Sequence, residues 1–167
     1  MYNNLYSFDG ERKGFILGGG IGAGYLSNST SYNSFSHTDN RAVFLTNFKI
    51  GYAPSNTLEI YCLSKVAWRE ESNKPNILGL LAVAARVYLN NETETGWSIS
   101  GGFGYSGISE PFESPLESRN GFGFFLGGGY EFISHWNVEL DLLYSKITER
   151  TKMNSFGLLL TVNVLAF

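Results

Sequence analysis

The sequence predicts an all-β fold, in which eight antiparallel strands run up and down and close into one barrel. The clearest signal is the stretch 121–144, where large apolar residues alternate with glycine or acidic residues. Successive strand side chains point to opposite faces, so this stretch should form a hairpin with one large apolar face. Glycine and isolated acids suit the cramped interior of a small barrel whose aromatic residues face lipid, so we expect a transmembrane barrel.

The composition supports the same fold class. The 167 residues include 20 glycines, 16% aromatic residues and only 16% charged residues, whereas a charged share of about 25% is usual. This length suits one domain over residues 1–167, beginning with a short polar lead at 1–11. A net charge of −3 excludes a basic nucleic-acid-binding footprint, and the lone Cys62 leaves no intrachain disulfide. The longest apolar run, 77–89, contains Arg86 and is too short for a membrane-spanning helix of about 20 residues.

Each strand is recognised by large residues at every second position, and each connection by turn-forming or polar residues. The first strand alternates large residues with glycine, and the next four alternate apolar residues with polar, charged or small ones. The stretch 121–144 supplies the sixth and seventh strands around a tight corner at Ser134-His135. Eight strands is an even number, as single-chain bacterial barrels require. The expected strands are 12–26, 41–53, 57–69, 76–89, 95–106, 121–132, 136–145 and 153–167.

The connections between these strands alternate in length and charge. Tight turns are expected near residues 54, 92 and 134. The other connections are longer or more charged: 27–40, 70–75, 107–120 and 147–152. Outer-membrane barrels have short periplasmic turns and longer outer loops, so this alternation puts both termini in the periplasm.

The aromatic residues sort into two levels along the expected barrel. Amphipathic rings gather at both membrane interfaces, so two girdles around an aliphatic band indicate a lipid environment. A soluble lipocalin-like barrel, the alternative architecture, would expose a row of large residues at 44–52 to water. The girdle at the short-turn end comprises Phe15, Tyr52, Trp97, Phe132 and Trp136, and the girdle at the loop end comprises Tyr25, Phe44, Trp68, Tyr105, Phe122 and Tyr144.

The chain resembles the small bacterial outer-membrane β-barrel superfamily, which includes opacity-like adhesins and the outer-membrane-protein-A-type barrel domain. The resemblance lies in the glycine-alternating stretch 14–25, the strand 121–132, the sequence Trp136-Asn137-Val138-Glu139-Leu140 and the terminal stretch 158–167. It implies a Gram-negative outer-membrane protein that contacts lipid and, during assembly, the barrel-insertion machinery. By the same resemblance, Phe167 would be the assembly signal.

The facing of the last strand is open at this point. Phe167 and Asn163 share one parity, whereas the apolar residues from Phe156 to Val164 share the other. Either a bulge shifts the register, or the terminal phenylalanine faces elsewhere than lipid.

Seven ionisable residues fall on the inward parity of their strands. Buried charges are tolerable when paired, and an eight-stranded lumen is just wide enough to be filled by side chains. We therefore expect a salt-bridge network; the alternative is a porin-like narrow pore or small-solute transporter lined by these charges. The seven residues are Lys49, Glu59, Lys65, Arg86, Glu131, Glu139 and Asp141.

The sequence gives little support for an enzymatic activity. His37 and His135 are the only histidines, and they are expected at opposite ends of the barrel. Ser36-His37 with Asp39 is the one local cluster that a lipid-modifying barrel enzyme, such as a lipid A deacylase, could use. No group of residues has convincing metal-ligand spacing, so we expect neither a metal nor a cofactor.

The expected function is a structural or surface-interaction role in the outer membrane, not an enzymatic one. Exposed loops are the natural place for binding, so a surface ligand would contact 27–40 or 107–120. The second loop intersperses three acids with Phe112 and Leu116. We expect a monomer.

Overall fold

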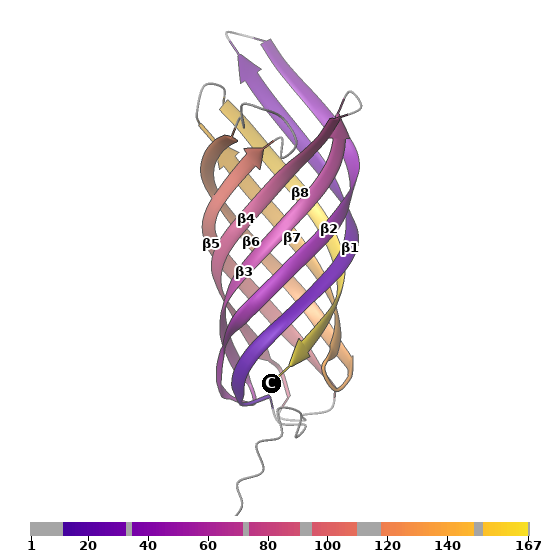
Figure 1. Ribbon diagram of the computed structural model, residues 1–167, viewed down its shortest axis with the longest axis vertical. Coiled ribbons are helices and arrows are strands. Elements are labelled where there is room, and N and C mark those ends of the chain that lie inside the picture. The colour runs from indigo at the N-terminus through magenta and orange to yellow at the C-terminus, as the bar shows by residue number, and fades with distance from the viewer. Residues whose placement is uncertain are drawn as a thin grey trace, which may run out of the picture.

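Eight antiparallel strands close on themselves to form a barrel (Figure 1). The computed structural model describes residues 12–32, 35–71, 74–90, 95–109, 118–148 and 152–166. Each strand pairs with its neighbours in the chain, and β1 closes the barrel by pairing with β8. The predicted all-β, eight-stranded fold is confirmed. The strands are β1 (Gly14–Tyr32), β2 (Phe35–Ser55), β3 (Leu58–Glu71), β4 (Lys74–Tyr88), β5 (Gly96–Ser109), β6 (Ser118–Ile133), β7 (Trp136–Ile147) and β8 (Lys152–Ala166).

Every strand exposes large apolar residues on its outer face. β8 shows the alternation most regularly, with Phe156, Leu158 and Leu160 exposed and Ser155 and Leu159 buried between them. The interior therefore holds the small and charged residues together with part of the aliphatic set, in the orientation that the sequence indicated. None of the described residues belongs to a helix long and apolar enough to cross a membrane.

The prediction of a long loop at 27–40 is wrong. β1 continues to Tyr32 and β2 begins at Phe35, and the two strands pair without interruption from Ser27 opposite Asn40 to Tyr32 opposite Phe35. This ribbon projects beyond the other strands (Figure 1). A polar sequence indicates solvent exposure, but backbone hydrogen bonding between two antiparallel strands can continue through polar residues that β-structure accepts.

Several other boundaries also differ by a few residues. The turn predicted at 53–56 lies at Asn56-Thr57, because Ala53, Pro54 and Ser55 belong to β2, where the register with β3 shifts. Pro54 lacks a backbone N–H and fits at such an irregularity. The predicted loops at 70–75 and 107–120 are shortened by the ends of four strands, while 110–117 and 149–151 lie outside the described residues.

The last strand contains no register shift. β8 pairs continuously with β1 and with β7, and its alternation places Asn163 in the lumen and Phe156 outside. A bulge within 152–166 is thereby excluded. Phe167 and the lead at 1–11 lie outside the described residues.

Glycines of β1 and β6 make room for larger residues on the neighbouring strand. Gly18, Gly20, Gly22 and Gly24 lie opposite lumen-facing residues of β8, and a Cβ at Gly20 would collide with the amide of Asn163. The glycine-rich sequence of β1 is therefore a packing requirement of a narrow lumen.

Candidate functional site

The lumen is crossed by ion pairs that join strands on different sides of the barrel. Glu139 on β7 accepts hydrogen bonds from Lys49 Nζ of β2 at 2.5 and 2.8 Å, and its Oε1 also contacts Arg86 Nη2 of β4. Asp141 on β7 pairs with Lys65 of β3. β7 neighbours only β6 and β8 in the sheet, so each of these pairs spans the interior.

A second group of charges lies nearer the short turns. Glu59 accepts a hydrogen bond from the hydroxyl of Tyr88 at 3.0 Å and lies 3.4 Å from Arg86 Nη1. Glu131 pairs with Arg12 at 2.7 Å, and the Arg12 guanidinium stacks 3.8 Å from the centre of the Tyr88 ring. All seven residues expected in the lumen are buried there.

Arg12 is a member of this network that the sequence reasoning missed. It lies just before β1 in the structure, and only 1% of its surface is exposed. The expected strand 12–26 begins at this residue, and its even parity, shared with Gly18 and Gly20, indicates the inward face. With Arg12 included, the described part of the lumen on the short-turn side of the apolar residues contains four cations and four carboxylates. The seven residues expected from the sequence are three cations and four acids. Arg12 pairs with Glu131 and is the fourth cation, so the buried charges balance.

Aromatic and amide side chains complete the packing around these charges. Lys49 Nζ lies 5.6 Å from the centre of the Tyr61 ring, and Lys65 Nζ lies 5.3 Å from that of Phe125, within reach of a cation–π attraction. Beside them, Asn47 donates to Asn163 at 2.7 Å, and Asn163 donates to the amide oxygen of Asn137 at 3.0 Å.

An apolar plug fills the lumen between this network and the loop end. Its members are buried and form one cluster drawn from all eight strands. The ion pairs on the short-turn side and the apolar side chains on the loop side thus both obstruct the lumen. The larger members of the plug are Leu26, Leu45, Tyr61, Leu63, Leu78, Leu80, Ile108, Phe125, Leu143, Ile147, Met153 and Leu159.

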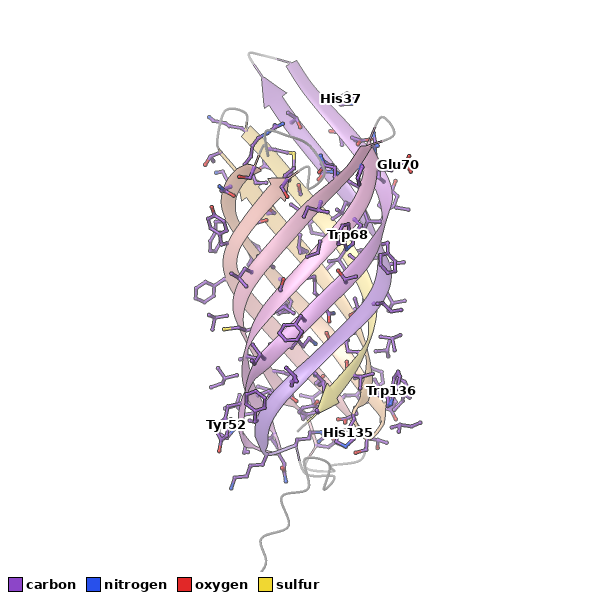
Figure 2. The ribbon with its side chains drawn as sticks, viewed as in Figure 1. His37, Tyr52, Trp68, Glu70, His135 and Trp136 are labelled. Atoms are coloured by element: carbon purple, nitrogen blue, oxygen red, sulfur yellow. The ribbon has the colours of Figure 1, made fainter. Side chains whose placement is uncertain are left out.

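The outer face exposes large apolar residues on all eight strands. Of the predicted girdle residues, nine are exposed and two, Trp68 and Tyr144, are half-buried. Figure 2 shows Tyr52 and Trp136 near the short-turn end and Trp68 in the half of the barrel nearer the loops. Trp68 Nε1 donates to Thr46 Oγ1 at 2.9 Å, so its polar edge is satisfied without water. The exposed members are Phe15, Tyr25, Phe44, Tyr52, Trp97, Tyr105, Phe122, Phe132 and Trp136.

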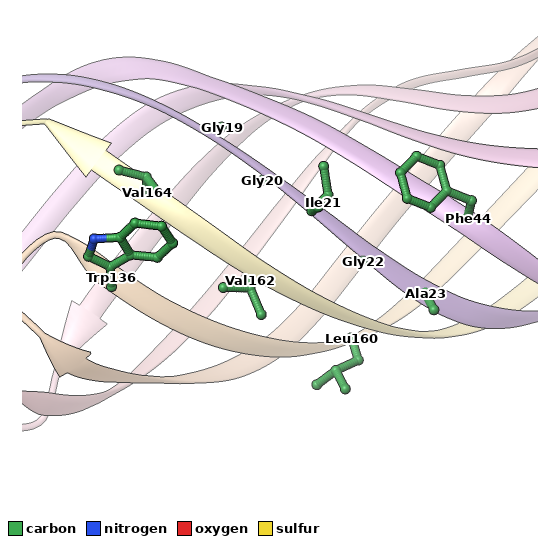
Figure 3. Close-up of a pocket in the computed structure, with 10 residues that line it drawn as sticks. All are labelled: Gly19, Gly20, Ile21, Gly22, Ala23, Phe44, Trp136, Leu160, Val162 and Val164. Carbon is green, nitrogen blue, oxygen red and sulfur yellow. The ribbon is translucent and has the colours of Figure 1, made fainter.

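A shallow apolar groove runs over the outer surface of β1 (Figure 3). It is floored by Gly19 and Ala23, which are small residues on the outward parity, and bordered by Phe44, Trp136 and Leu160. The groove is almost purely hydrocarbon, so it has nothing to orient a polar substrate.

The two histidines lie at opposite ends of the barrel, His37 at the loop end and His135 at a short turn (Figure 2). They cannot share a site. Asp39, the acid of the one candidate catalytic cluster, pairs with Arg41 at 2.6 Å, and the side chain of Ser36 lies outside the described residues. Among the residues that the structure describes, no group of three or more could hold a metal ion.

A polar cluster at the loop-end mouth was also missed by the sequence reasoning. Arg41, Arg69 and Arg119 line one cavity there with Asn28 and Asp39. The polar residues of the stretch 27–40 predict a loop, which has no strand parity. Alternation continued through that stretch would have placed Asn28 and Asp39 on the lumen side with Arg41.

Comparison with solved structures identifies barrels of the same size, although no family model and no curated protein matches the chain. The attachment invasion locus protein Ail of Yersinia pestis superposes with a TM-score of 0.53 at 14% identity, covering 90% of this chain and 99% of that one. Neisserial surface protein A gives a TM-score of 0.56 at 15% identity, over 90% and 96%. The outer membrane protein OprG of Pseudomonas aeruginosa gives 0.52 at 14% identity, over 93% and 98%. The chain therefore has the fold of the small eight-stranded outer-membrane barrels.

Proposed function

We propose that this protein is an integral outer-membrane barrel of a Gram-negative bacterium, with a side-chain-filled lumen and a structural or surface-interaction role at its loop end. The observation that carries the proposal is the pair of acids on β7. Glu139 and Asp141 hold cations from β2, β3 and β4 across the interior. Bonds of this kind obstruct the path that a transported solute would need, which favours a role at the surface over transport.

The outer face supports the membrane part of the proposal. Phe15 and Tyr25 mark the two aromatic levels on β1 and are ten positions apart. That separation is about 33 Å along a strand, or about 25 Å along the axis at a typical tilt of about 40°. Outer-membrane barrels carry an apolar band of about 25 Å. A soluble protein would leave this whole belt exposed to water, far beyond the apolar patches of ordinary monomers.

The orientation and assembly proposals follow from the two unlike ends. Two of the three connections at the end where the chain enters β1 are two-residue turns, at 56–57 and 134–135, and the β1–β2 ribbon projects from the other end, so we assign both termini to the periplasm. The projecting β1–β2 ribbon and the segment 107–120 then face outward and form the surface offered to a ligand. We further propose that the barrel-insertion machinery reads the terminal Phe167 and that the assembled barrel is monomeric.

Membrane residence is tested with the full chain, refolded in detergent micelles or lipid vesicles. The proposal expects a folded protein only in the presence of micelles or lipid, and faster migration of the unboiled sample on denaturing gels. A chain that folds and remains monomeric in plain buffer would contradict it.

Orientation is tested by cysteine labelling in a Cys62→Ser background. Thr38→Cys places a thiol on the exposed ribbon, and the control Ser134→Cys places one at a short turn. A membrane-impermeant maleimide applied to intact cells should label the first and spare the second. The reverse pattern would invert the proposed orientation.

A further inference from the structure

The loop-end mouth of the lumen contains a polar cavity of about 220 Å³, here called the mouth cup. Every residue that lines it lies on the lumen-facing parity of its strand, so the cup is the upper end of the lumen. Ile108 and Met153 line it and also belong to the apolar plug below. The cup is therefore a closed-bottomed recess that faces the loop side of the barrel.

Guanidinium groups dominate the described lining of the cup. Arg41, Arg69 and Arg119 come from β2, β3 and β6, and the described carboxylate among the lining residues is Asp39. A recess lined in this way attracts negative charge, since its low-dielectric walls concentrate the field of the arginines.

Two of these arginines are held in position by neighbouring groups. Arg41 uses Nε to pair with Asp39 at 2.6 Å and Nη1 to donate to the backbone carbonyl oxygen of Glu70 at 2.5 Å. Arg69 Nε donates to Asn76 Oδ1 at 3.2 Å. These bonds fix the planes of both guanidinium groups and reduce the entropy that a ligand would have to remove.

A second observation points independently to a ligand. Asn28 lines the cup and is only 4% exposed, yet within the described part of the chain neither its Nδ2 nor its Oδ1 has a hydrogen-bond partner. A buried amide without partners costs about 1–3 kcal/mol, so a polar group that enters the cup would relieve it. A ligand oxygen accepting from Nδ2 has the required chemistry.

We propose that the mouth cup binds a phosphate group. Arginine forks match phosphate oxygens in bidentate geometry, and Asn28 adds a neutral donor. Cavities for drug-sized ligands begin at about 300 Å³, so this smaller recess suits a compact anionic group such as a phosphate monoester. The group could come from a phosphorylated lipid headgroup at the membrane surface or from a soluble sugar phosphate. A phosphate group would then be the ligand of the proposed surface role, and the inference rests on that role.

The test uses the full chain refolded in micelles of an uncharged detergent at constant ionic strength. Inorganic phosphate and glucose 1-phosphate are titrated while arginine Nε–H resonances are followed by NMR. Saturable shifts are expected, and Arg41→Gln, Arg69→Gln and Arg119→Gln should each weaken binding at least tenfold. Asn28→Leu should weaken it without loss of thermal stability, which keeps the test valid if an arginine variant fails to fold.

Matched controls are Lys146→Gln and Lys152→Gln. Each removes one positive charge at the same end of the barrel from an exposed, outward position. They should leave the affinity within about twofold, because exposed charges act weakly on a recessed ligand. No saturation in the wild-type chain, or equal losses in the controls, would overturn the proposal.

Two further experiments distinguish a soluble phosphate ligand from a lipid headgroup. Binding of soluble phosphate supports a soluble ligand, whereas arginine-dependent shifts that require a phosphate-bearing lipid in nanodiscs support a headgroup. Binding that emerges only in Glu110→Gln/Glu113→Gln/Glu117→Gln would overturn the proposal and assign the cup to the chain's own carboxylates. Gel mobility and lipid dependence test the membrane role separately, so the cup can fail while the barrel proposal stands.

Discussion

In the lumen, two glycines of β6 lie opposite two acidic residues of β7. Gly127 lies opposite Asp141, and Gly129 lies opposite Glu139. Each acid that holds a cation across the interior therefore has a glycine beside it. A Cβ at Gly127 would collide with Oδ1 of Asp141, so this glycine leaves the space in which the carboxylate meets Lys65.

Gly127→Ala should destabilise the barrel by about 2–4 kcal/mol, because the added methyl displaces a buried, paired carboxylate. The measurement is reversible urea unfolding in lipid vesicles, followed by tryptophan fluorescence. Gly128→Ala is the control: Gly128 faces outward, and a Cβ there meets only the backbone oxygen of Ser98 at 3.7 Å. Equal effects of the two substitutions would contradict the matching of glycine and acid.

The Lys65–Asp141 pair makes a sharper prediction at the same scale. Asp141→Leu leaves the buried Lys65 ammonium without its carboxylate and should cost about 3–5 kcal/mol. Lys65→Met combined with Asp141→Leu removes both charges and should cost much less than the sum of the two single changes. A double-mutant cycle on unfolding free energies measures the difference. Strict additivity would show that the pair is not coupled.

At the scale of the element, the β6–β7 connection is a two-residue turn at Ser134-His135. His135 has a φ of 73°, in the left-handed region, and its backbone N–H donates to Glu131 Oε1 at 3.0 Å. The register shifts between Glu131 and Ile133 just before the turn. The carboxylate that pairs with Arg12 thus also holds the turn, and links a connection to the lumen network.

His135→Val should destabilise the protein by about 1–2 kcal/mol relative to His135→Gly, since a β-branched residue is disfavoured at positive φ. Both variants remove the imidazole, so their difference isolates the backbone conformation. Urea unfolding of the two variants provides the measurement. Equal stabilities would show that the turn relaxes to a conformation with negative φ.

Strand parity was readable from the sequence, but strand ends were less so. Phe44, Trp97 and Leu140 face outward as predicted, because alternation is a local property of the chain. The polar residues of the projecting ribbon predict a loop, although the structure shows paired strands there. Polarity reports the solvent around a segment, whereas its backbone pairing depends on the partner strand.

For the whole molecule, the lumen contacts depend on how the sheet closes. Which cation meets which acid is set by strand stagger around the barrel, and no local pattern encodes that stagger. The sequence identified Lys49 and Glu139 as inward residues without pairing them, and it left out Arg12 altogether. The mouth cup depends on closure for the same reason, since its arginines come from β2, β3 and β6.

The central claim is that the barrel faces lipid with its aromatic residues and closes its own lumen with cross-strand ion pairs. Planar-bilayer recording of the refolded wild-type protein tests both parts at once. The account predicts that the protein inserts, with only small and rare current steps, and that Lys49→Ala/Glu139→Ala increases their size or frequency. Large, stable conductance from the wild-type barrel, unchanged in that variant, would contradict the account.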